Sequence, residues 1–477
     1  MNVLAVDQGT SATKALVVAP ERGVLAEAEV PVHPRAVADG GVEQDPEELW
    51  ASVVEAGRLA LERAREPVGA VGLANQGETV LAWDRETARP LSVALSWQDR
   101  RAAAVCERLV GRSHELAQLT GLSLDPYFAA PKITWLREHV TDAGVASTTD
   151  AWLVARLTGA FVSDAATASR TLLLDLDRVD WSPEACEVFG IDPATLPVVS
   201  DCAEPVGETT AFGPPLPLAG LAVDQQAALF AESCLAAGEA KCTYGTGAFL
   251  LATVGEKPRR SRTGLVGCVA WRLGGRTTYC LDGQVYTVGA AVGWLQRIGL
   301  IAGPEDLDRL GGEVDSPGGV AFVPGLAGLG APFWRPAARG AFVGLSLGAS
   351  RAHLVRAVVE GIAAQVAWLA KAAGDDLGQP LQRLRVDGGL TRSTLLMQVQ
   401  ADLLQAPVEV YPSPNATALG VAALARLGSG DGADPAAVTG GWSPVATYEP
   451  RVTAAEAAER LQHWRRAAEA TVDLDSQ

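Results

Sequence analysis

Short apolar runs alternate with polar turns at the start of the chain. The segments NVLAVD, KALVVAP and RGVLAEAEVPV follow one another, with QGTSAT after the first. Runs of this length between turn-forming residues predict three strands joined in a meander. Apolar residues at helical spacing then follow Asp45 and predict a helix over residues 46–64. Together with the next apolar segment, AVGLANQ, this pattern predicts a mixed α/β unit.

The stretch LANQGETVLAWD, residues 73–84, places a glycine and a carboxylate between two apolar segments. A hairpin turn is the simplest interpretation, because Gly77 supplies unusual backbone angles while the polar side chains, including Glu78, face water. A functional role for Glu78 therefore requires evidence that these residues do not form a solvent-exposed hairpin turn.

A Pro/Gly-rich stretch, TTAFGPPLPLAGLAVDQQ, divides the chain near its middle. Because 477 residues exceed one ordinary hydrophobic core, we predict two domains, residues 1–220 and 221–477. The second domain repeats the theme of the first, since KCTYGTGAFLLATV predicts two strands around a Gly-Thr turn. Helical periodicity follows in SRAHLVRAVVEGIAAQVAWLAKAA, and LRVDGGLTRSTLLMQVQADLLQ is typical of a strand, a glycine turn and a helix.

The composition excludes several classes of protein. Hydrophobic residues make up 48% of the chain and charged residues 20%, which indicates a large core. A net charge of −17 disfavours nucleic acid and anionic membranes as partners, because both would be repelled. The seven cysteines form no CxxC pair, and no apolar run approaches the ~20 residues that cross a bilayer. We therefore predict a cytoplasmic protein without nucleic-acid or membrane partners.

Two turns can present backbone N–H groups and hydroxyls to a phosphate. In AVDQGTSATK, Asp7 ends an apolar strand and is able to hold Mg²⁺ through water, while Thr10 and Ser11 follow in the turn. The second turn, TYGTGAF, contains Thr246. Taken alone, each motif is also compatible with a plain turn that binds no ligand. One such turn in each domain predicts a nucleotide held in a cleft between them.

The segment AVDQQAAL interrupts an apolar passage with Asp224 and two glutamines. A buried carboxylate is costly unless it has a partner or a task. A kinase needs one carboxylate that accepts the proton of the attacking hydroxyl, and Asp224 is the candidate. A helix N-cap is the alternative interpretation, and one residue can serve both roles.

Taken together, these motifs resemble the FGGY carbohydrate kinases, and within that family the glycerol kinases. The resemblance extends in order from residue 3 to about 425 and rests on these segments: VDQGTSATKALV, NQGETVLAWD, SWQDRR, LDPYFAAPK, VDQQAALF, YGTGAF, LDGQVYTVGAAVGWL, GLGAPFWRPAARGAFVGLS, VDGGLTRSTLLMQVQADLL and TALGVAALA. It implies an α/β fold of two ribonuclease H-like, actin-like ATPase domains that close around an interdomain cleft. It also implies ATP and Mg²⁺ as cofactors, a small polyol or sugar as substrate, and is compatible with a homodimer or homotetramer.

The resemblance assigns roles to individual residues. The metal and phosphate positions are Asp7 for Mg²⁺, Thr10, Ser11, Ala12 and Lys14 in the first turn, and Thr246 in the second. The nucleotide positions are Gly289, Gly293, Gly388, Gly389 and Ser393, of which Ser393 replaces the family's asparagine. Asp224 matches the catalytic base. The polyol positions are Glu78, Tyr127, Asp224 and Gln225, with Trp97 and Phe249 as apolar walls.

One substrate position departs from the family, because Gly77 stands where glycerol kinases carry an arginine. Loss of a charged hydrogen bond costs about 1.5 to 3 kcal/mol if nothing replaces it. Either another side chain or water fills the gap and glycerol remains the substrate, or a tetritol, pentitol or pentulose such as xylulose occupies it. A non-metabolic actin-like ATPase is a remoter alternative. The absence of Lys, Arg and His from Val206 to Gln226 also argues against the bisphosphate and histidine regulation known in the family.

Overall fold

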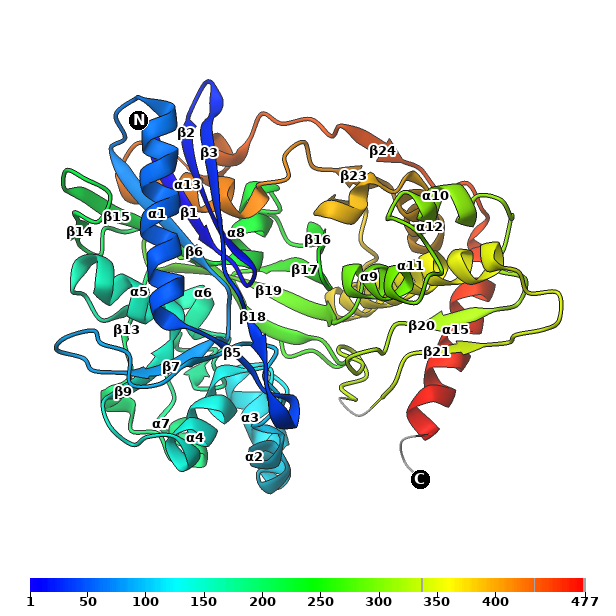
Figure 1. Cartoon of the computed structure of the whole chain (residues 1–477), viewed down its shortest axis with the longest axis horizontal. Coiled ribbons are helices and arrows are strands. Elements are labelled where there is room, and N and C mark those ends of the chain that lie inside the picture. Colours follow the sequence, from blue (N-terminus) through cyan, green and yellow to red (C-terminus); the bar gives the residue numbers. More distant parts are fainter. Residues whose placement is uncertain (336–337, 433, 475–477) are drawn as a thin grey trace.

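The structure, a computed structural model that describes residues 1–335, 338–432 and 434–474, has two lobes (Figure 1). A mixed β-sheet with helices against it forms the centre of each lobe. This arrangement confirms the predicted α/β fold with two domains.

The sheet of the N-terminal lobe has six strands in the order β14-β15-β6-β1-β2-β3. Their bounds are β1 Val3–Gln8, β2 Ala12–Ala19, β3 Gly23–Pro31, β6 Ala70–Asn75, β14 Glu208–Thr209 and β15 Leu216–Val223. The predicted meander is confirmed, since β1, β2 and β3 pair in antiparallel fashion. β6 lies parallel to both β1 and β15.

Helices cover both faces of this sheet, which explains its nearly continuous apolar strands. Along β1, Leu4 and Val6 pack toward α1 (Pro46–Ala64), whereas Val3 and Ala5 pack in the cluster that contains α13 (Ala416–Gly428). The side chains of a strand alternate between faces, so a strand buried on both sides has no polar alternation. As the sequence predicted, α1 starts behind Asp45, whose side chain accepts a hydrogen bond from the Glu47 N–H at 2.9 Å.

The sheet of the C-terminal lobe repeats this plan, with seven strands in the order β18-β19-β17-β16-β22-β23-β24. Their bounds are β16 Ala240–Tyr244, β17 Ala248–Gly255, β18 Val266–Leu273, β19 Arg276–Val285, β22 Leu384–Asp387, β23 Val408–Val410 and β24 Ala446–Tyr448. The β16–β17 hairpin corresponds to β1–β2, and β22 lies parallel to β16 as β6 lies parallel to β1. Each lobe therefore presents a tight turn beside the carboxyl end of a parallel strand.

Smaller elements complete the two lobes. The remaining strands are β4 Arg35–Ala36, β5 Val42–Gln44, β7 Val80–Trp83, β8 Ala94–Leu95, β9 Val145–Thr148, β10 Val162–Asp164, β11 Leu174–Asp175, β12 Asp180–Trp181, β13 Val198–Ser200, β20 Ala321–Val323 and β21 Ala341–Val343. The remaining helices are α2 Ala103–Arg108, α3 Ser113–Thr120, α4 Ala129–His139, α5 Thr149–Thr158, α6 Ala165–Ala168, α7 Pro183–Phe189, α8 Asp224–Ala231, α9 Gly289–Arg297, α10 Asp306–Gly311, α11 Arg351–Leu377, α12 Thr394–Leu404, α14 Pro435–Thr439 and α15 Ala454–Leu474.

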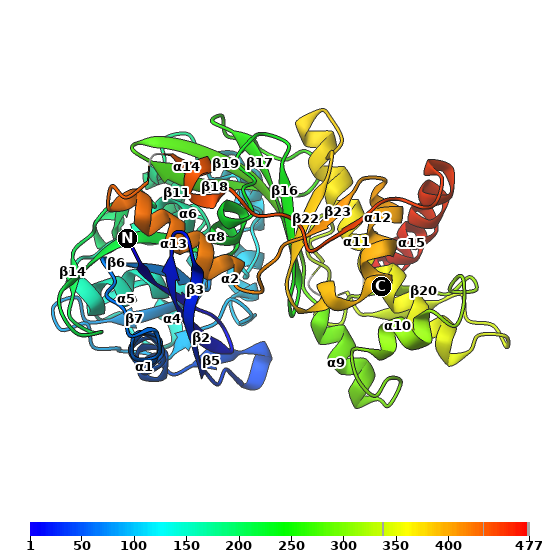
Figure 2. The ribbon, with the colours of Figure 1, turned by 90° about the horizontal axis from the view of Figure 1, so that it is seen from above.

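The two lobes exchange segments. Figure 2 shows α13, in orange, beside the blue strands of the N-terminal sheet, although it follows most of the C-terminal lobe in sequence. The domain boundary predicted at residue 220 lies inside β15, which continues to Val223. The helix that begins at Asp224 is thus attached directly to a strand of the N-terminal sheet.

The helix α11 forms much of the core of the C-terminal lobe. It is long and apolar enough to cross a membrane by length and composition, and 72% of its most apolar window is buried inside the protein. Its capping box at Ser350 and His353 fixes its first turn. Burial against the C-terminal sheet explains its apolar sequence.

Candidate functional site

Three parallel strands of the N-terminal sheet end at the same edge. Asp7 lies near the end of β1, Asn75 ends β6, and Asp224 follows β15. In the register of the sheet, Asp7 pairs with Ala74 and Val223 pairs with Asn75. Ligands of open α/β sheets bind outside the carboxyl ends of the strands. This edge is therefore the natural location of a binding site, and it brings Asp7 and Asp224 together.

Electrostatics at this edge favour binding of a cation. Burial raises the pKa of Asp7 to about 7, with a further contribution from the charge of Asp224, while Lys14 opposes the shift. Burial likewise raises the pKa of Asp224, and Lys241 is the largest opposing influence. Two neighbouring carboxylates suit a hard divalent cation such as Mg²⁺, which prefers oxygen ligands and retains several waters. Among the described residues no group of three or more acidic, histidine or cysteine side chains forms a metal cage.

Hydrogen bonds within the turn and from Trp97 hold the first predicted phosphate turn in place. The Gly9 N–H donates to the Ala12 carbonyl at 3.0 Å, which closes the turn between β1 and β2. The indole N–H of Trp97 donates to Thr10 Oγ1 at 2.9 Å. Ser11 is exposed at the tip of the turn, whereas Lys14 forms an ion pair with Glu29 at 3.6 Å. The turn is thus held in place while its tip stays accessible.

The structure contradicts the hairpin interpretation of residues 73–84. β6 belongs to the six-stranded sheet, whereas β7 belongs to a separate sheet of five strands. Glu78, at the crossing between them, is only 3% exposed and has a φ of 60°. This left-handed conformation is strained for a residue other than glycine, and such strain persists mainly at functional positions. Glu78 is therefore a buried carboxylate rather than a solvated turn residue.

Gly77 leaves no open gap. A Cβ atom at this position would lie 2.8 Å from Val223 Cγ2 and 3.8 Å from Arg170 Nε. The structure shows that other side chains occupy this place, as one of the two outcomes left open by the sequence requires. The guanidinium of Arg170 lies there and forms ion pairs with Glu78 and Asp282.

Three predicted aromatic residues gather beside Glu78. The ring of Trp97 lies edge-on to Tyr127 at a centroid distance of 5.9 Å and to Phe249 at 6.1 Å. Trp97 and Tyr127 belong to the N-terminal lobe, and Phe249 comes from β17 of the other lobe. Amphipathic rings of this kind form walls against the carbon chain of a small polar ligand.

A buried lysine holds the Tyr127 loop. Lys132 is fully buried in α4, and its Nζ donates to the carbonyl oxygens of Pro126 at 3.0 Å, Phe128 at 2.8 Å and Tyr127. Burial lowers the pKa of Lys132 to about 7, while the charge of Glu78 acts in the opposite direction. This contact fixes the backbone on which Tyr127 is presented.

Asp224 does not act as a helix N-cap. The N-cap of α8 is Val223, and Asp224 is the first helical residue, with its Oδ1 accepting the Gln225 N–H at 2.6 Å. Lys241 of the other lobe donates to Gln225 Oε1 at 2.6 Å. Because an ammonium only donates, this bond orients the amide and leaves its NH₂ group as a donor. The Gln225 side chain also lowers the pKa of Asp224, consistent with this orientation.

The second predicted turn opens into a cavity of about 670 Å³ in the C-terminal lobe. Four predicted nucleotide-site residues line it, namely Thr246, Gly289, Gly389 and Ser393. The Gly289 N–H donates to the Gly245 carbonyl at 3.0 Å, which joins the turn to the start of α9. Gly293 lies one turn further along α9 and is outside the described lining.

Ser393 lies in the wall of this cavity, whereas Gly388 precedes the lining residue Gly389 and is itself outside the described lining. Gly388 has a φ of 95°, and a Cβ there would lie 2.5 Å from the Tyr244 carbonyl oxygen, so only glycine fits. Ser393 caps α12 by accepting the Leu396 N–H at 3.1 Å and donates to Asp308. Asp308 also accepts the Thr394 N–H at 2.8 Å. These hydrogen bonds fix the backbone at the start of α12 beside the cavity.

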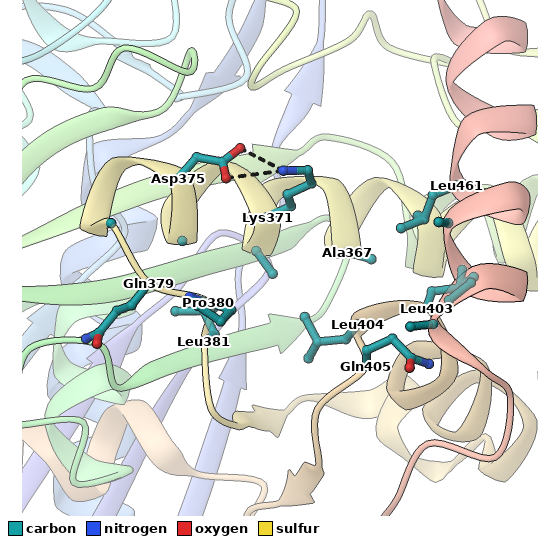
Figure 3. A pocket seen from close by; sticks show the side chains of 16 residues that line it. Ala367, Lys371, Asp375, Gln379, Pro380, Leu381, Leu403, Leu404, Gln405 and Leu461 are labelled. Carbon is teal, nitrogen blue, oxygen red and sulfur yellow. Dashed lines mark hydrogen bonds and ion pairs between the residues drawn. The ribbon is translucent and has the colours of Figure 1, made fainter.

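A second cavity, of about 520 Å³, contains none of the predicted site residues. Figure 3 shows it between α11, α12 and α15, where Leu403, Leu404 and Leu461 provide an apolar surface. The ion pair of Lys371 and Asp375 lies at its rim. The arrangement is typical of imperfect packing between helices rather than of a polar substrate site.

Sequence reasoning missed three buried cations of the site: Arg170, Lys132 and Lys241. Each contacts a predicted substrate residue or its backbone. The segments TASRTLLL, APKITWL and EAKCTY do contain a signal, since each places one cation in a mainly uncharged and apolar stretch. A buried cation requires an acidic or carbonyl partner, but the sequence does not reveal which.

Comparison with known proteins agrees with this geometry. Residues 2–231 match the N-terminal domain of the FGGY family of carbohydrate kinases, and residues 240–428 match its C-terminal domain. A glycerol kinase of Alkalilimnicola ehrlichii is 44% identical, covering 98% of this chain and 97% of that protein. A glycerol kinase of Thermus brockianus is 43% identical, covering 98% of both. Among solved structures, Plasmodium falciparum glycerol kinase with ADP has a TM-score of 0.90 at 29% identity, covering 98% of both chains.

Proposed function

The chain belongs to the FGGY family of carbohydrate kinases, and on that premise we propose that it transfers the terminal phosphoryl group of ATP to glycerol, forming sn-glycerol 3-phosphate. The observation that carries this proposal is the cluster of the polar side chains Glu78, Tyr127 and Gln225 near Asp224, which forms the polyol pocket of this proposal. Hydrogen-bonding side chains with aromatic walls suit a small polyhydroxylated substrate.

In this proposal Asp224 accepts the proton of the attacking hydroxyl. Its pKa is raised by burial, which brings the carboxylate closer to the range of an effective general base. The turn that contains Thr10 and the turn that contains Thr246 present N–H and hydroxyl groups to the phosphates from the two lobes. Mg²⁺, when bound, neutralises phosphate charge, and Asp7 would hold it. Closure of the lobes would exclude water, so that ATP is not hydrolysed.

Crowding beside Gly77 favours a three-carbon substrate. Val223 and Arg170 occupy the place that a longer polyol or ketose would need. The aromatic and polar residues at the cleft floor also have no evident use in a non-metabolic ATPase. Glycerol is therefore the first choice, and a tetritol, pentitol or pentulose the second.

A panel of substrates tests the proposal. The wild-type protein is assayed with glycerol, erythritol, xylitol and D-xylulose, and ADP release is followed in a coupled assay. We expect the highest kcat/KM with glycerol. A higher value with a five-carbon substrate would replace glycerol, and ATP hydrolysis that no polyol accelerates would favour the ATPase alternative.

Three further predictions accompany the proposed function. Chelation of Mg²⁺ should abolish activity, because the phosphate charge would no longer be neutralised. The cytoplasmic location and a homodimer or homotetramer remain predictions, which fractionation and sedimentation measurements would test.

A further inference from the structure

Arg170 contacts two residues of the proposed polyol pocket, Glu78 and Tyr127. It follows α6 in a segment whose Ser169 Oγ accepts the Val269 N–H of β18 at 3.0 Å. The Arg170 side chain is only 3% exposed. Its guanidinium forms ion pairs with Glu78 of the N-terminal lobe and Asp282 of β19 in the C-terminal sheet. One residue thus connects a proposed substrate ligand with the opposite lobe.

The contacts of Arg170 fix the direction of the hydrogen bonds around it, because a guanidinium donates and never accepts. Its Nε donates to Glu78 Oε1. Within the described part of the chain, Glu78 Oε2 has no hydrogen-bond partner and does not belong to the fully buried unpaired atoms. Glu78 therefore offers this second oxygen as an acceptor for a ligand hydroxyl.

The same reasoning applies to Tyr127. Arg170 Nη2 donates to the phenol oxygen of Tyr127 at 3.2 Å. Because the oxygen accepts from Arg170, the phenol proton is directed elsewhere and can be donated to a ligand. A polyol hydroxyl needs both an acceptor for its proton and a donor for its lone pairs, and Arg170 arranges one of each.

We propose that Arg170 is the positioning residue of the polyol pocket, setting Glu78 as acceptor and Tyr127 as donor. The inference rests on the proposed function, since it takes a polyhydroxylated substrate for granted. A purely structural ion pair would stabilise the junction of the lobes without affecting recognition. The two possibilities can be distinguished because the chain contains a second ion-paired arginine, Arg272, that serves as a control.

Arg272 provides the matched control. It lies on β18, forms an ion pair with Asp201 and donates to the carbonyl of Val199 at 2.8 Å. It contacts neither Glu78 nor Tyr127 through any described hydrogen bond. Its replacement by methionine removes a similar set of interactions at a distance from the pocket.

The experiment compares the full-length wild type with Arg170→Met, Arg170→Lys and Arg272→Met. Glycerol binding is measured by calorimetry, and KM for both substrates with kcat by coupled assay. We expect Arg170→Met to weaken glycerol binding by about 10- to 100-fold, with KM for ATP changed less than about twofold. Arg170→Lys should recover part of the loss, because it retains the charge but not the planar fork. Arg272→Met should lower thermal stability without altering glycerol binding.

A double-mutant cycle with Tyr127→Phe separates positioning from general damage. The phenylalanine substitution should weaken glycerol binding in the wild type but have little further effect in Arg170→Lys, where the phenol is no longer oriented. Equal losses in both backgrounds, or parallel changes in the KM of glycerol and ATP, would overturn the inference.

If another panel member is the better ligand, it replaces glycerol as the probe. If the wild type binds no polyol or ketose, the proposed function and this inference fall together; if it binds one and Arg170→Lys binds it equally well, only the inference falls.

Discussion

The proposed polyol pocket and the proposed nucleotide cavity are built from different parts of the chain. Glu78, Arg170 and Asp282 are each at most 3% exposed, so the polyol pocket depends on buried and paired side-chain charges. The cavity of the C-terminal lobe is lined by Gly245, Gly289 and Gly389 as well as by side chains such as those of Glu305, Asp308 and Arg392. The first region is made of side chains, whereas the second also depends on glycines that keep the backbone accessible.

This difference determines how each region should respond to substitution. A buried charge left without its partner is costly, so single polar changes should disturb the polyol pocket. A backbone-lined wall tolerates polar changes nearby but not an added Cβ where chains approach closely. The predictions below use this contrast, beginning with the largest expected effect.

Replacement of Asp224 should impair phosphoryl transfer and leave the nucleotide cavity intact. We expect Asp224→Asn to lower kcat by about 10²- to 10⁴-fold, because the proton of the attacking hydroxyl loses its acceptor. Nucleotide binding, measured by calorimetry with ATP, should stay within about twofold of the wild type. A near-normal kcat would remove Asp224 from the mechanism.

An added methyl group at Gly289 should affect the nucleotide cavity alone. Its Cβ would lie 2.5 Å from the Gly245 carbonyl oxygen, so the turn that carries Thr246 must shift. We expect Gly289→Ala to raise KM for ATP by about 10- to 100-fold and leave glycerol binding nearly unchanged. Gly111→Ala is the control, since a Cβ at Gly111 meets no atom within 4 Å. Equal effects on both substrates would contradict the separation of the two regions.

Trp97 connects the proposed polyol pocket with the first predicted phosphate turn of the N-terminal lobe. Its indole N–H donates to Thr10 Oγ1, while its ring packs edge-on to Tyr127. Trp97→Phe removes the hydrogen bond and keeps an aromatic ring, so KM for ATP and for glycerol should each rise by about two- to tenfold. A change in only one of the two constants, seen in steady-state kinetics, would show that this hydrogen bond does not couple them.

The smallest effect on turnover is expected at Asp150, a buried carboxylate outside both regions. Burial, reinforced by Asp164, raises the pKa of Asp150 from 3.8 to about 6. Between these two pKa values the folded protein keeps a proton that the unfolded chain has released. The stabilising contribution of this group is therefore complete only below about pH 4 and is lost as the pH rises through 6. We expect Asp150→Asn to raise the free energy of unfolding by about 3 kcal/mol at pH 8 and about half as much at pH 5.

Urea denaturation of the wild type and Asp150→Asn at the two pH values measures this difference. Activity with glycerol should be unchanged, because Asp150 lies in α5 and bonds Ser163 rather than any site residue. An equal gain in stability at both pH values would show that ionisation of Asp150 is not its cause.

Much of the fold and part of the site followed from local patterns. The first meander, the helix behind Asp45 and the turn around Thr246 were predicted because turn and capping residues act within a few positions of one another. Among the nucleotide positions, the Gly388–Gly389 turn was predicted from its local pattern, whereas Gly289, Gly293 and Ser393 were predicted through the family resemblance. The side-chain pocket was predictable only through the family resemblance.

The sequence by itself determined the alternation of strands and turns, the amphipathic helices and the acidic residues at strand ends. Only the tertiary structure decided that residues 73–84 pass between two sheets, that Gly77 is crowded, and that Arg170 pairs with Glu78 and Asp282. Those ion pairs join residues 92 and 112 positions apart. Hydrophobic periodicity and turn chemistry are local properties, whereas the partner of a buried charge is set by which distant segments pack together.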